Sequence, residues 1–261
     1  MILKIAMLMF IGMTAGYAGV IGKEVTYNSE SLTLKGHLAY DDATRDKRPG
    51  ILVVHEWWGN NDYSHKRTDM LAGLGYVALA VDMYGDGKQA DNPGDAGKMA
   101  GELMKNPSAL VARFTAAMDF LKNDEHVDAS QIGAIGYCFG GGVVLAMARA
   151  GVDLKATVCF HGSVATQTPV KKGDVKGKIL VCNGAADKFV PETDIKKFKD
   201  EMKSAGVDFK FVDYPGATHA FTNPAATELG KKFNMPIAYN EKADKRSWSE
   251  MQKLFNKVFK K

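Results

Sequence analysis

The segment Gln131–Ala150 is QIGAIGYCFGGGVVLAMARA, an apolar run followed by a glycine-rich turn and a helix-forming stretch. Its turn, Gly136–Gly140, has the pattern G-x-C-x-G, the cysteine version of a motif in which a sharp strand-to-helix turn exposes a nucleophile. Glycines suit such a turn because they let the backbone and neighbouring strands approach closely. The turn also places Cys138 at a helix N-terminus, where the helix dipole favours a thiolate. The segment therefore predicts a nucleophilic cysteine, and the alternative is a buried structural cysteine.

Around this segment, apolar runs alternate with segments of helical periodicity. Leu32–Tyr40 has apolar residues two or four apart, as in a half-buried strand, whereas most later runs are continuous, as in parallel strands covered on both faces. The predicted strands are Val25–Tyr27, Leu32–Tyr40, Gly50–His55, Tyr76–Val81, Gln131–Tyr137, Ala156–Phe160, Lys178–Cys182 and Phe209–Tyr214. The predicted helices are Ser64–Leu74, Ser108–Lys122, Gly140–Ala150, Glu192–Ala205 and Lys245–Phe259. This order predicts an α/β fold with a mostly parallel central sheet, helices on both faces and an antiparallel N-terminal edge.

The first residues predict export. Lys4 precedes the apolar run Ile5–Met13, and small residues at Gly16 and Ala18 follow, as in a secretory signal peptide cleaved after Ala18. The apolar run is too short to span a bilayer, which takes about 20 residues. We therefore expect residues 1–18 to be removed, 19–261 to form a single α/β domain, and the mature protein to be periplasmic or secreted from a bacterium. The alternative is a buried N-terminal helix.

Composition limits the function classes. With 34 basic and 30 acidic residues among 261, the formal net charge is only +4, which gives no electrostatic case for nucleic-acid binding. Three cysteines are too few for a disulfide framework. Cys159 and Cys182 lie in predicted strands and are expected to be buried free thiols, with a disulfide between them as the alternative. We expect no metal or cofactor, a small-molecule partner, no membrane span beyond the leader, and a monomer.

Two further residues stand where partners of a nucleophile are expected. In the alternating scheme the acid follows a later strand and the histidine follows the last one. Asp187 comes just after the strand Lys178–Cys182, and His219 comes after Phe209–Tyr214. Each has an ordinary alternative, since Asp187 could cap a helix and His219 could be a surface histidine. All three residues in this order predict a Cys138–His219–Asp187 triad.

A fourth motif, His55–Gly59 (HEWWG), follows the strand that begins at Gly50. It is not a zinc-protease motif, because H-E-x-x-H would need histidine where Gly59 stands. In an α/β hydrolase the loop after this strand supplies one N–H of the oxyanion hole. We therefore expect the backbone N–H groups of Trp57 and Phe139 to bind the negative charge that develops on a carbonyl oxygen.

Taken together, GYCFGGG, Asp187 in NGAADKFVP, His219 in YPGATHAF and the HEWWG loop resemble the dienelactone hydrolase family of α/β hydrolases. The resemblance extends from about Val25 to the C-terminal helix. It implies the Cys138–His219–Asp187 triad. It also implies that Glu56 lies beside the nucleophile and helps to control ionisation of the thiol. His161 falls where the family has a substrate-contacting aromatic residue.

Two positions depart from the family pattern. Lactone-cleaving members hold a substrate carboxylate with two arginines, but this sequence has Asp86 and Asn223 at those positions. An acid and an amide cannot form a bidentate cationic clamp, although Lys88 could replace it in part. The departures put dienelactone itself in doubt as the substrate and leave the hydrolytic chemistry intact.

The predicted pocket is aromatic. Its expected lining residues are Trp57, Trp58, Tyr84, Phe139, Phe160, His161 and Phe221, although Tyr84 and Phe160 could equally be core residues. The loop-rich segment Asp82–Asn106 follows the carboxyl end of a strand, where such sheets bind ligands, and is a candidate cap.

These features predict a hydrolase that cleaves a small carboxylic ester or lactone through a thioester acyl-enzyme. The alternatives are a thiol-dependent acyltransferase with the same intermediate and a non-catalytic small-ligand binder on the same fold. A complete triad argues against the binder, because binding alone needs no such order of residues.

Overall fold

A computed structural model describes residues 19–43 and 45–259, so the predicted leader, residues 1–18, lies outside the described residues. The strands are β1 (Val20–Ser29), β2 (Leu32–Asp41), β3 (Arg48–Val54), β4 (Val77–Val81), β5 (Val127–Tyr137), β6 (Ala156–Phe160), β7 (Lys178–Gly184) and β8 (Phe209–Tyr214). The helices are α1 (Asp62–Ala72), α2 (Pro93–Met104), α3 (Pro107–Lys122), α4 (Phe139–Arg149), α5 (Glu192–Ser204), α6 (Ala226–Phe233) and α7 (Glu241–Val258).

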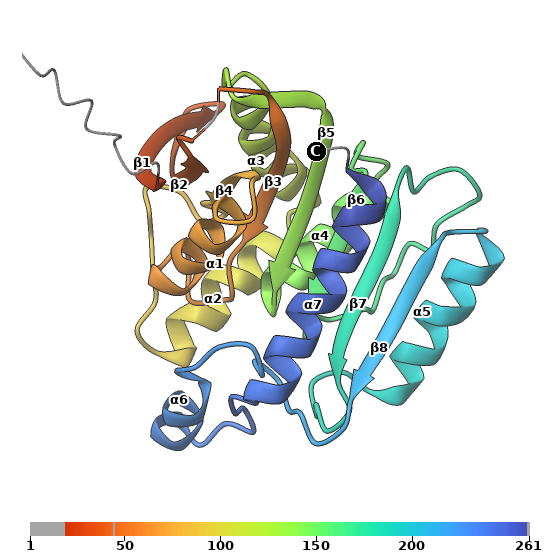
Figure 1. The fold of residues 1–261 in the computed structure, drawn as a ribbon. Coiled ribbons are helices and arrows are strands. Elements are labelled where there is room, and N and C mark those ends of the chain that lie inside the picture. The colour runs from red at the N-terminus through yellow and green to blue at the C-terminus, as the bar shows by residue number, and fades with distance from the viewer. Residues whose placement is uncertain (1–18, 44, 260–261) are drawn as a thin grey trace, which may run out of the picture.

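The strands form one twisted sheet in the order β1-β2-β4-β3-β5-β6-β7-β8 (Figure 1). From β4 to β8 all neighbouring strands are parallel. Strands β1 and β2 form an antiparallel hairpin, and β2 also pairs antiparallel with β4. This arrangement confirms the predicted mostly parallel sheet with an antiparallel N-terminal edge.

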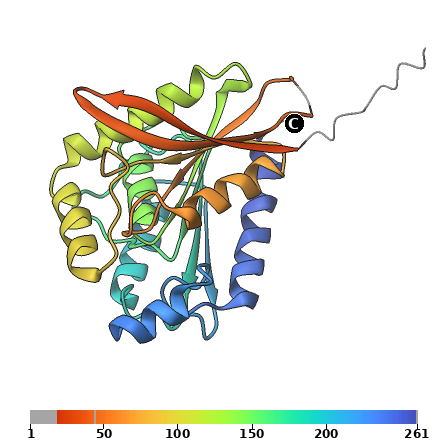
Figure 2. The same cartoon turned by 90° about the vertical axis from the view of Figure 1, so that its left-hand side faces the viewer.

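Helices cover both faces of this sheet, as the continuous apolar strands require (Figure 2). In β3, Leu52 and Val54 pack into the core beneath α3 and α4, whereas Ile51 and Val53 pack into the core beneath α1 and α7. A third apolar cluster lies between α4, α5 and the strands β6 and β7. Alternate residues of one strand thus face opposite cores, because successive side chains of a strand point to opposite faces.

Two helices in the structure have no counterpart among the predicted elements. Helix α2 lies within the segment expected to be a loop, and three glycines of low helix propensity obscure its apolar residues Ala96 and Leu103. Helix α6 has only 8 residues and no side-chain cap. The helix predicted from Ser108 begins one residue earlier, at Pro107, and the side chain of Asn106 caps it.

The two remaining cysteines lie deep in the sheet. Cys159 faces the cluster beneath α5, and Cys182, in the adjacent strand, faces the cluster beneath α7. The two thiols therefore point to opposite faces, and neither forms a disulfide. Burial raises the pKa of the Cys159 thiol to about 12, so this group is not a thiolate near neutral pH. Over the residues described, no helix is both long and apolar enough to cross a membrane.

The parallel strands bring the sites predicted from sequence to one end of the sheet. Glu56 follows β3, Cys138 follows β5, Asp187 follows β7, and His219 follows β8. The carboxyl ends of parallel strands lie at the same end of the sheet, and ligands bind at that end in open α/β sheets. The fold therefore gathers side chains that are far apart in sequence at the edge where α6 also lies (Figure 1).

We expect Gly140→Ala to lower the free energy of unfolding by about 1–3 kcal/mol, the usual cost of overpacking. A Cβ at this position would overlap the carbonyl oxygens of Val54 and His55. Gly101→Ala is the matched control, because beyond its chain neighbours and the backbone of its own helix no atom lies within 4 Å of the Cβ it would add. Urea unfolding of both variants measures the difference, and equal stabilities would contradict the packing described here.

Candidate active site

Cys138 lies in the sharp turn between β5 and α4, with φ 52° and ψ −114°. Few residues other than glycine adopt a positive φ, so the surrounding structure must hold this conformation. Gly136 and Gly140 allow the turn, since a Cβ on Gly136 would overlap the Gly140 carbonyl group. The Cys138 N–H donates to the Phe160 carbonyl oxygen at 3.0 Å, and the Gly140 N–H donates to the His55 carbonyl oxygen at 3.1 Å. The turn is thus tied to the ends of both neighbouring strands.

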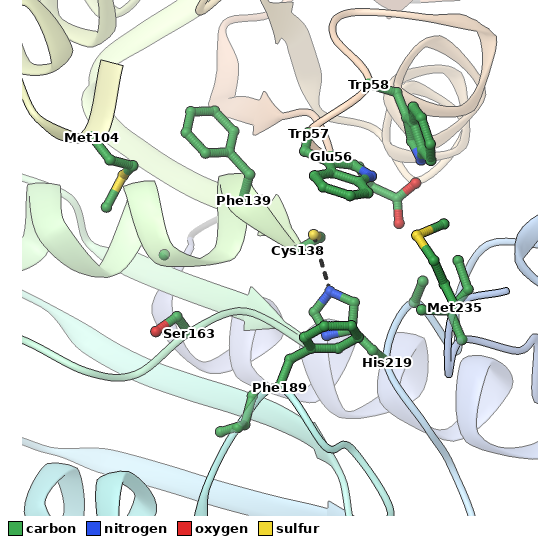
Figure 3. Close-up of a pocket in the computed structure, with 14 residues that line it drawn as sticks. Glu56, Trp57, Trp58, Met104, Cys138, Phe139, Ser163, Phe189, His219 and Met235 are labelled. Atoms are coloured by element: carbon green, nitrogen blue, oxygen red, sulfur yellow. Dashed lines mark hydrogen bonds between the residues drawn. The ribbon is translucent and has the colours of Figure 1, made fainter. Parts of the chain in front are cut away.

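The Cys138 thiol faces the ring of His219 (Figure 3). The distance from Sγ to His219 Nε2 is 3.0 Å, and the distance from His219 Nδ1 to Asp187 Oδ2 is 2.8 Å. Asp187 is buried, and its other oxygen accepts the N–H of Phe189 at 2.8 Å. The structure therefore brings the three predicted residues into one hydrogen-bonded row.

Electrostatics favour a charged His219 in this row. Burial lowers the pKa of His219, but the adjacent Cys138 sulfur and Asp187 carboxylate outweigh it and hold that pKa well above its usual value. An imidazolium beside the sulfur stabilises a thiolate. The geometry thus suits proton transfer from Cys138 to His219, with Asp187 fixing the ring orientation.

A hydrogen bond to His161 helps to hold the turn at Cys138. His161 is fully buried and has a positive φ of 41°. Its Nδ1 accepts the Cys138 N–H at 3.1 Å, so the ring proton lies on Nε2, which donates to the Thr222 hydroxyl at 2.7 Å. Burial, together with the positive His219 and Arg67, holds the pKa of His161 well below its usual value. His161 is therefore a neutral ring, and its Nδ1 and the Phe160 carbonyl oxygen both accept the Cys138 N–H.

The Thr222 hydroxyl connects this ring to a buried ion pair. Thr222 Oγ1 lies 2.6 Å from the hydroxyl of Tyr63, and Arg67 Nη2 donates to the Thr222 carbonyl oxygen at 2.6 Å. Arg67 also pairs with Asp244 of α7 at 2.6 Å, and both side chains are largely buried. A continuous polar network thus runs from α7 through α1 to the turn at Cys138.

Glu56 is buried and lacks a full set of partners. Its Oε2 accepts a hydrogen bond from Asn223 Nδ2 at 2.7 Å, whereas its buried Oε1 has no partner among the described residues. Burial raises the pKa of Glu56 to about 7, against the lowering effects of Asn223, His219 and Arg67. No hydrogen bond joins Glu56 to the Cys138 thiol, which is bonded to His219 instead. Asn223 therefore acts as a partner of Glu56, a role that the sequence does not reveal.

The peptide between Glu56 and Trp57 has a fixed orientation. His55 Nε2 accepts the Met83 N–H, so Nδ1 carries the ring proton and donates to the Glu56 carbonyl oxygen at 2.5 Å. Because the carbonyl and N–H of a trans peptide point in opposite directions, the Trp57 N–H is turned away from His55. Tyr84 fixes the next peptide by donating to the Trp57 carbonyl oxygen at 2.9 Å.

Both amides of the expected oxyanion hole are available. The Trp57 N–H has no acceptor among the described residues. Phe139 is the first residue of α4, so its N–H has no carbonyl of its own helix to bond. Both residues line the same cavity as Cys138. The amides are therefore free to bind an oxyanion.

The cavity beside Cys138 has a volume of about 280 Å³. Its walls are mostly apolar, with Glu56, Ser163, Cys138 and His219 as the polar side chains (Figure 3). The remaining side chains come from four loops and two helix ends, and they are Trp57, Trp58, Met104, Phe139, Phe189, Val190, Ala220, Met235 and Ile237. Met104 ends α2, so the segment expected to cap the site contributes to its wall.

Several expected pocket residues do not line this cavity. Tyr84, His161 and Phe221 are buried, as is Phe160. Tyr84 supports the Trp57 loop, His161 supports the turn at Cys138, and Phe221 packs against His161 with ring centroids 5.2 Å apart. These residues follow strand ends, as expected, but their side chains face the core. Of the seven expected pocket residues, Trp57, Trp58 and Phe139 line the cavity.

Other cavity residues were missed by sequence reasoning. Phe189 is 53% exposed, two residues after Asp187, and Ser163 follows His161 by the same interval. Met235 and Ile237 follow α6, and a bridge between Ile237 and His219 holds that loop at the site. Proximity to the triad could have indicated the first two, but no local signal marks the last two. Asp86 and Lys88 pair with each other at 3.5 Å and do not line the cavity.

Comparison with known proteins shows which family these features belong to. The profile of the dienelactone hydrolase family matches residues 34–259. This chain belongs to the dienelactone hydrolase family. It is 33% identical to Protein usf of Aquifex pyrophilus over 84% of this chain and 95% of that one. It is 30% identical to a protein of Aquifex aeolicus named "Putative carboxymethylenebutenolidase", over 78% of this chain and 88% of that one.

Solved structures of the family have the same fold. The structure titled m3DLH superposes with a TM-score of 0.88 at 37% identity, over 93% of this chain and all of that one. A dienelactone hydrolase-like promiscuous phosphotriesterase, P91, from metagenomic libraries superposes with a TM-score of 0.85 at 33% identity, with the same coverage. The dienelactone hydrolase likeness supports hydrolase activity of this type and confirms the α/β-hydrolase fold.

We expect Thr222→Val to lower the free energy of unfolding by about 1–3 kcal/mol, because it removes the hydroxyl partner of both His161 and Tyr63 while keeping the side-chain shape. Thr193→Val, at an exposed position of α5, is the control and should change stability by less than about 0.5 kcal/mol. Thermal or urea unfolding measures both. If the two variants are equally stable, the buried network does not hold the turn.

Proposed function

We propose that this protein hydrolyses small carboxylic esters or lactones, with Cys138 as nucleophile, His219 as general base and acid, and Asp187 as the residue that orients His219. The observation that carries the proposal is the contact of 3.0 Å between Cys138 Sγ and His219 Nε2, in line with the 2.8 Å contact to Asp187. Family membership supports the same class of reaction.

The first half of the reaction forms a thioester. His219 takes the thiol proton, and the sulfur attacks the carbonyl carbon of the substrate. The N–H groups of Trp57 and Phe139 then bind the oxyanion, and loss of one such donor typically lowers the rate by about 10²–10³. As the intermediate collapses, the carbon–oxygen bond to the alcohol breaks and His219 returns the proton to the leaving alkoxide.

The second half releases the acid. His219, again neutral, takes a proton from water, and the resulting hydroxide attacks the thioester carbonyl. The same two amides bind the second oxyanion, and the carbon–sulfur bond breaks to restore the thiolate beside the His219 imidazolium. Asp187 keeps His219 in one orientation throughout, because its oxygen holds the Nδ1 proton.

We expect Cys138→Ala to reduce kcat/KM for p-nitrophenyl acetate by at least about 10³-fold under reducing conditions, because it removes the nucleophile. Cys182→Ala is the matched control, since that thiol is buried in the sheet and should affect stability more than turnover. Equal turnover in wild type and Cys138→Ala would contradict the proposal. Binding without turnover would favour the ligand-binding alternative, and acyl transfer to an added alcohol in preference to water would favour the acyltransferase.

A further inference from the structure

The cavity is lined by an acidic side chain but by no lysine or arginine. Of the fourteen lining residues, none is lysine or arginine, and Glu56 is the only carboxylate. Cys138 and His219 carry opposite charges when the thiol is ionised, so together they contribute no net charge. Among the side chains that line the cavity, Glu56 is therefore the one that adds a net charge, and that charge is negative when Glu56 is ionised. The Asp187 carboxylate lies outside the lining, hydrogen-bonded to His219.

No neighbouring cation cancels this charge through a direct contact. The positive charge of Arg67 lowers the pKa of Glu56, but its guanidinium donates hydrogen bonds to Asp244 and to the Thr222 carbonyl oxygen and none to Glu56. The only described hydrogen-bond partner of the Glu56 side chain is the uncharged Asn223. The charges that lower the pKa of Glu56 are those of His219 and Arg67. The buried phenols of Tyr63 and Tyr137 also lie near Glu56, and its negative charge raises the pKa of both.

Asn223 is fixed in this role and offers nothing to an anion. Its Nδ2 donates to Glu56, and its Oδ1 accepts the Ala225 N–H at 2.9 Å, so both ends of the amide are occupied. The unpaired Glu56 Oε1 is an acceptor when the carboxyl is ionised, and Figure 3 shows the Glu56 carboxyl group directed into the space between Trp57 and Met235. A substrate carboxylate here would meet a second negative charge among apolar walls, where repulsion is weakly screened.

From this juxtaposition we propose that the cavity selects uncharged esters or lactones and excludes substrates that carry a carboxylate, with Glu56 as the specificity-determining residue. The statement about substrates rests on the proposed function, whereas the exclusion of anions from the cavity does not. A volume of about 280 Å³ and mostly apolar walls suit a small apolar acyl group.

The first test needs no turnover. Iodoacetamide and iodoacetate alkylate the same sulfur, but only the second carries a carboxylate, and the buried Cys159 and Cys182 are protected from both. The rate with iodoacetamide divided by the rate with iodoacetate is measured at Cys138 and for free cysteine. The first ratio divided by the second measures how strongly the cavity excludes the anion. We expect this normalised preference for iodoacetamide to be at least about tenfold at about pH 8, and to fall as the pH drops below about 7 and Glu56 becomes protonated.

Two variants show whether Glu56 is responsible. Glu56→Gln keeps the shape and an acceptor for Asn223, and it should lose both the preference and its pH dependence. Glu125→Gln removes the same charge from an exposed residue before β5, at the opposite end of that strand from Cys138, and should retain both. A wild-type ratio equal to that of Glu56→Gln, or a preference for iodoacetate, would overturn the proposal.

The second test extends the comparison to substrates. p-Nitrophenyl butyrate and mono-p-nitrophenyl succinate have the same leaving group and similar length, and only the succinate carries a carboxylate. We expect kcat/KM for the butyrate to be at least about tenfold higher at about pH 8, and the difference to shrink in Glu56→Gln. Hydrolysis of both esters at similar rates would overturn the selectivity while leaving the hydrolase intact. Selective alkylation without hydrolysis of either ester would support anion exclusion and contradict the proposed function.

Discussion

The backbone of Cys138, held at a φ of 52°, is the constraint on which the site depends. This conformation turns the chain from β5 into α4 within one residue, so that the thiol meets His219 and the first amide of the helix is left unbonded. It is unfavourable for a residue with a Cβ, and packing elsewhere must offset its cost. The offsetting contacts are the close approaches at Gly136 and Gly140 and the hydrogen bonds from Cys138 and Gly140 to neighbouring strands.

The polar groups around this turn differ in how completely they are paired. Arg67 is buried but matched by Asp244 and a carbonyl oxygen, and His161 is neutral with both ring nitrogens bonded. These groups hold the turn and carry no unbalanced charge. Two groups are less completely paired in the described part of the chain: the buried Tyr137 hydroxyl has no partner, and one oxygen of the ionisable Glu56 carboxyl group has none. Incomplete pairing of a buried carboxyl group is costly, and such groups gather at functional sites.

Local patterns account for what could be predicted from the sequence. The turn around Cys138 is a contiguous motif. Asp187 follows a strand with a continuous apolar run, and His219 follows the last strand, in which apolar and charged residues alternate, so their place at one end of the sheet follows from the parallel order of the strands. Side-chain direction could not be predicted, and Tyr84, His161 and Phe221 therefore proved to be buried supports. The contact between Glu56 and Asn223 joins residues 167 positions apart, and no spacing rule reveals it. Helix α2 was missed because of its three glycines.

The central claim is that Cys138 forms a covalent intermediate with the acyl part of an ester. The most direct measurement is mass spectrometry of protein rapidly quenched in acid during turnover of p-nitrophenyl butyrate, followed by peptide mapping. A single butyryl group on the peptide that contains Cys138, absent after the substrate is consumed, is the expected result. Turnover with no acyl group on any peptide, or with the group on another residue, would contradict a thioester at Cys138.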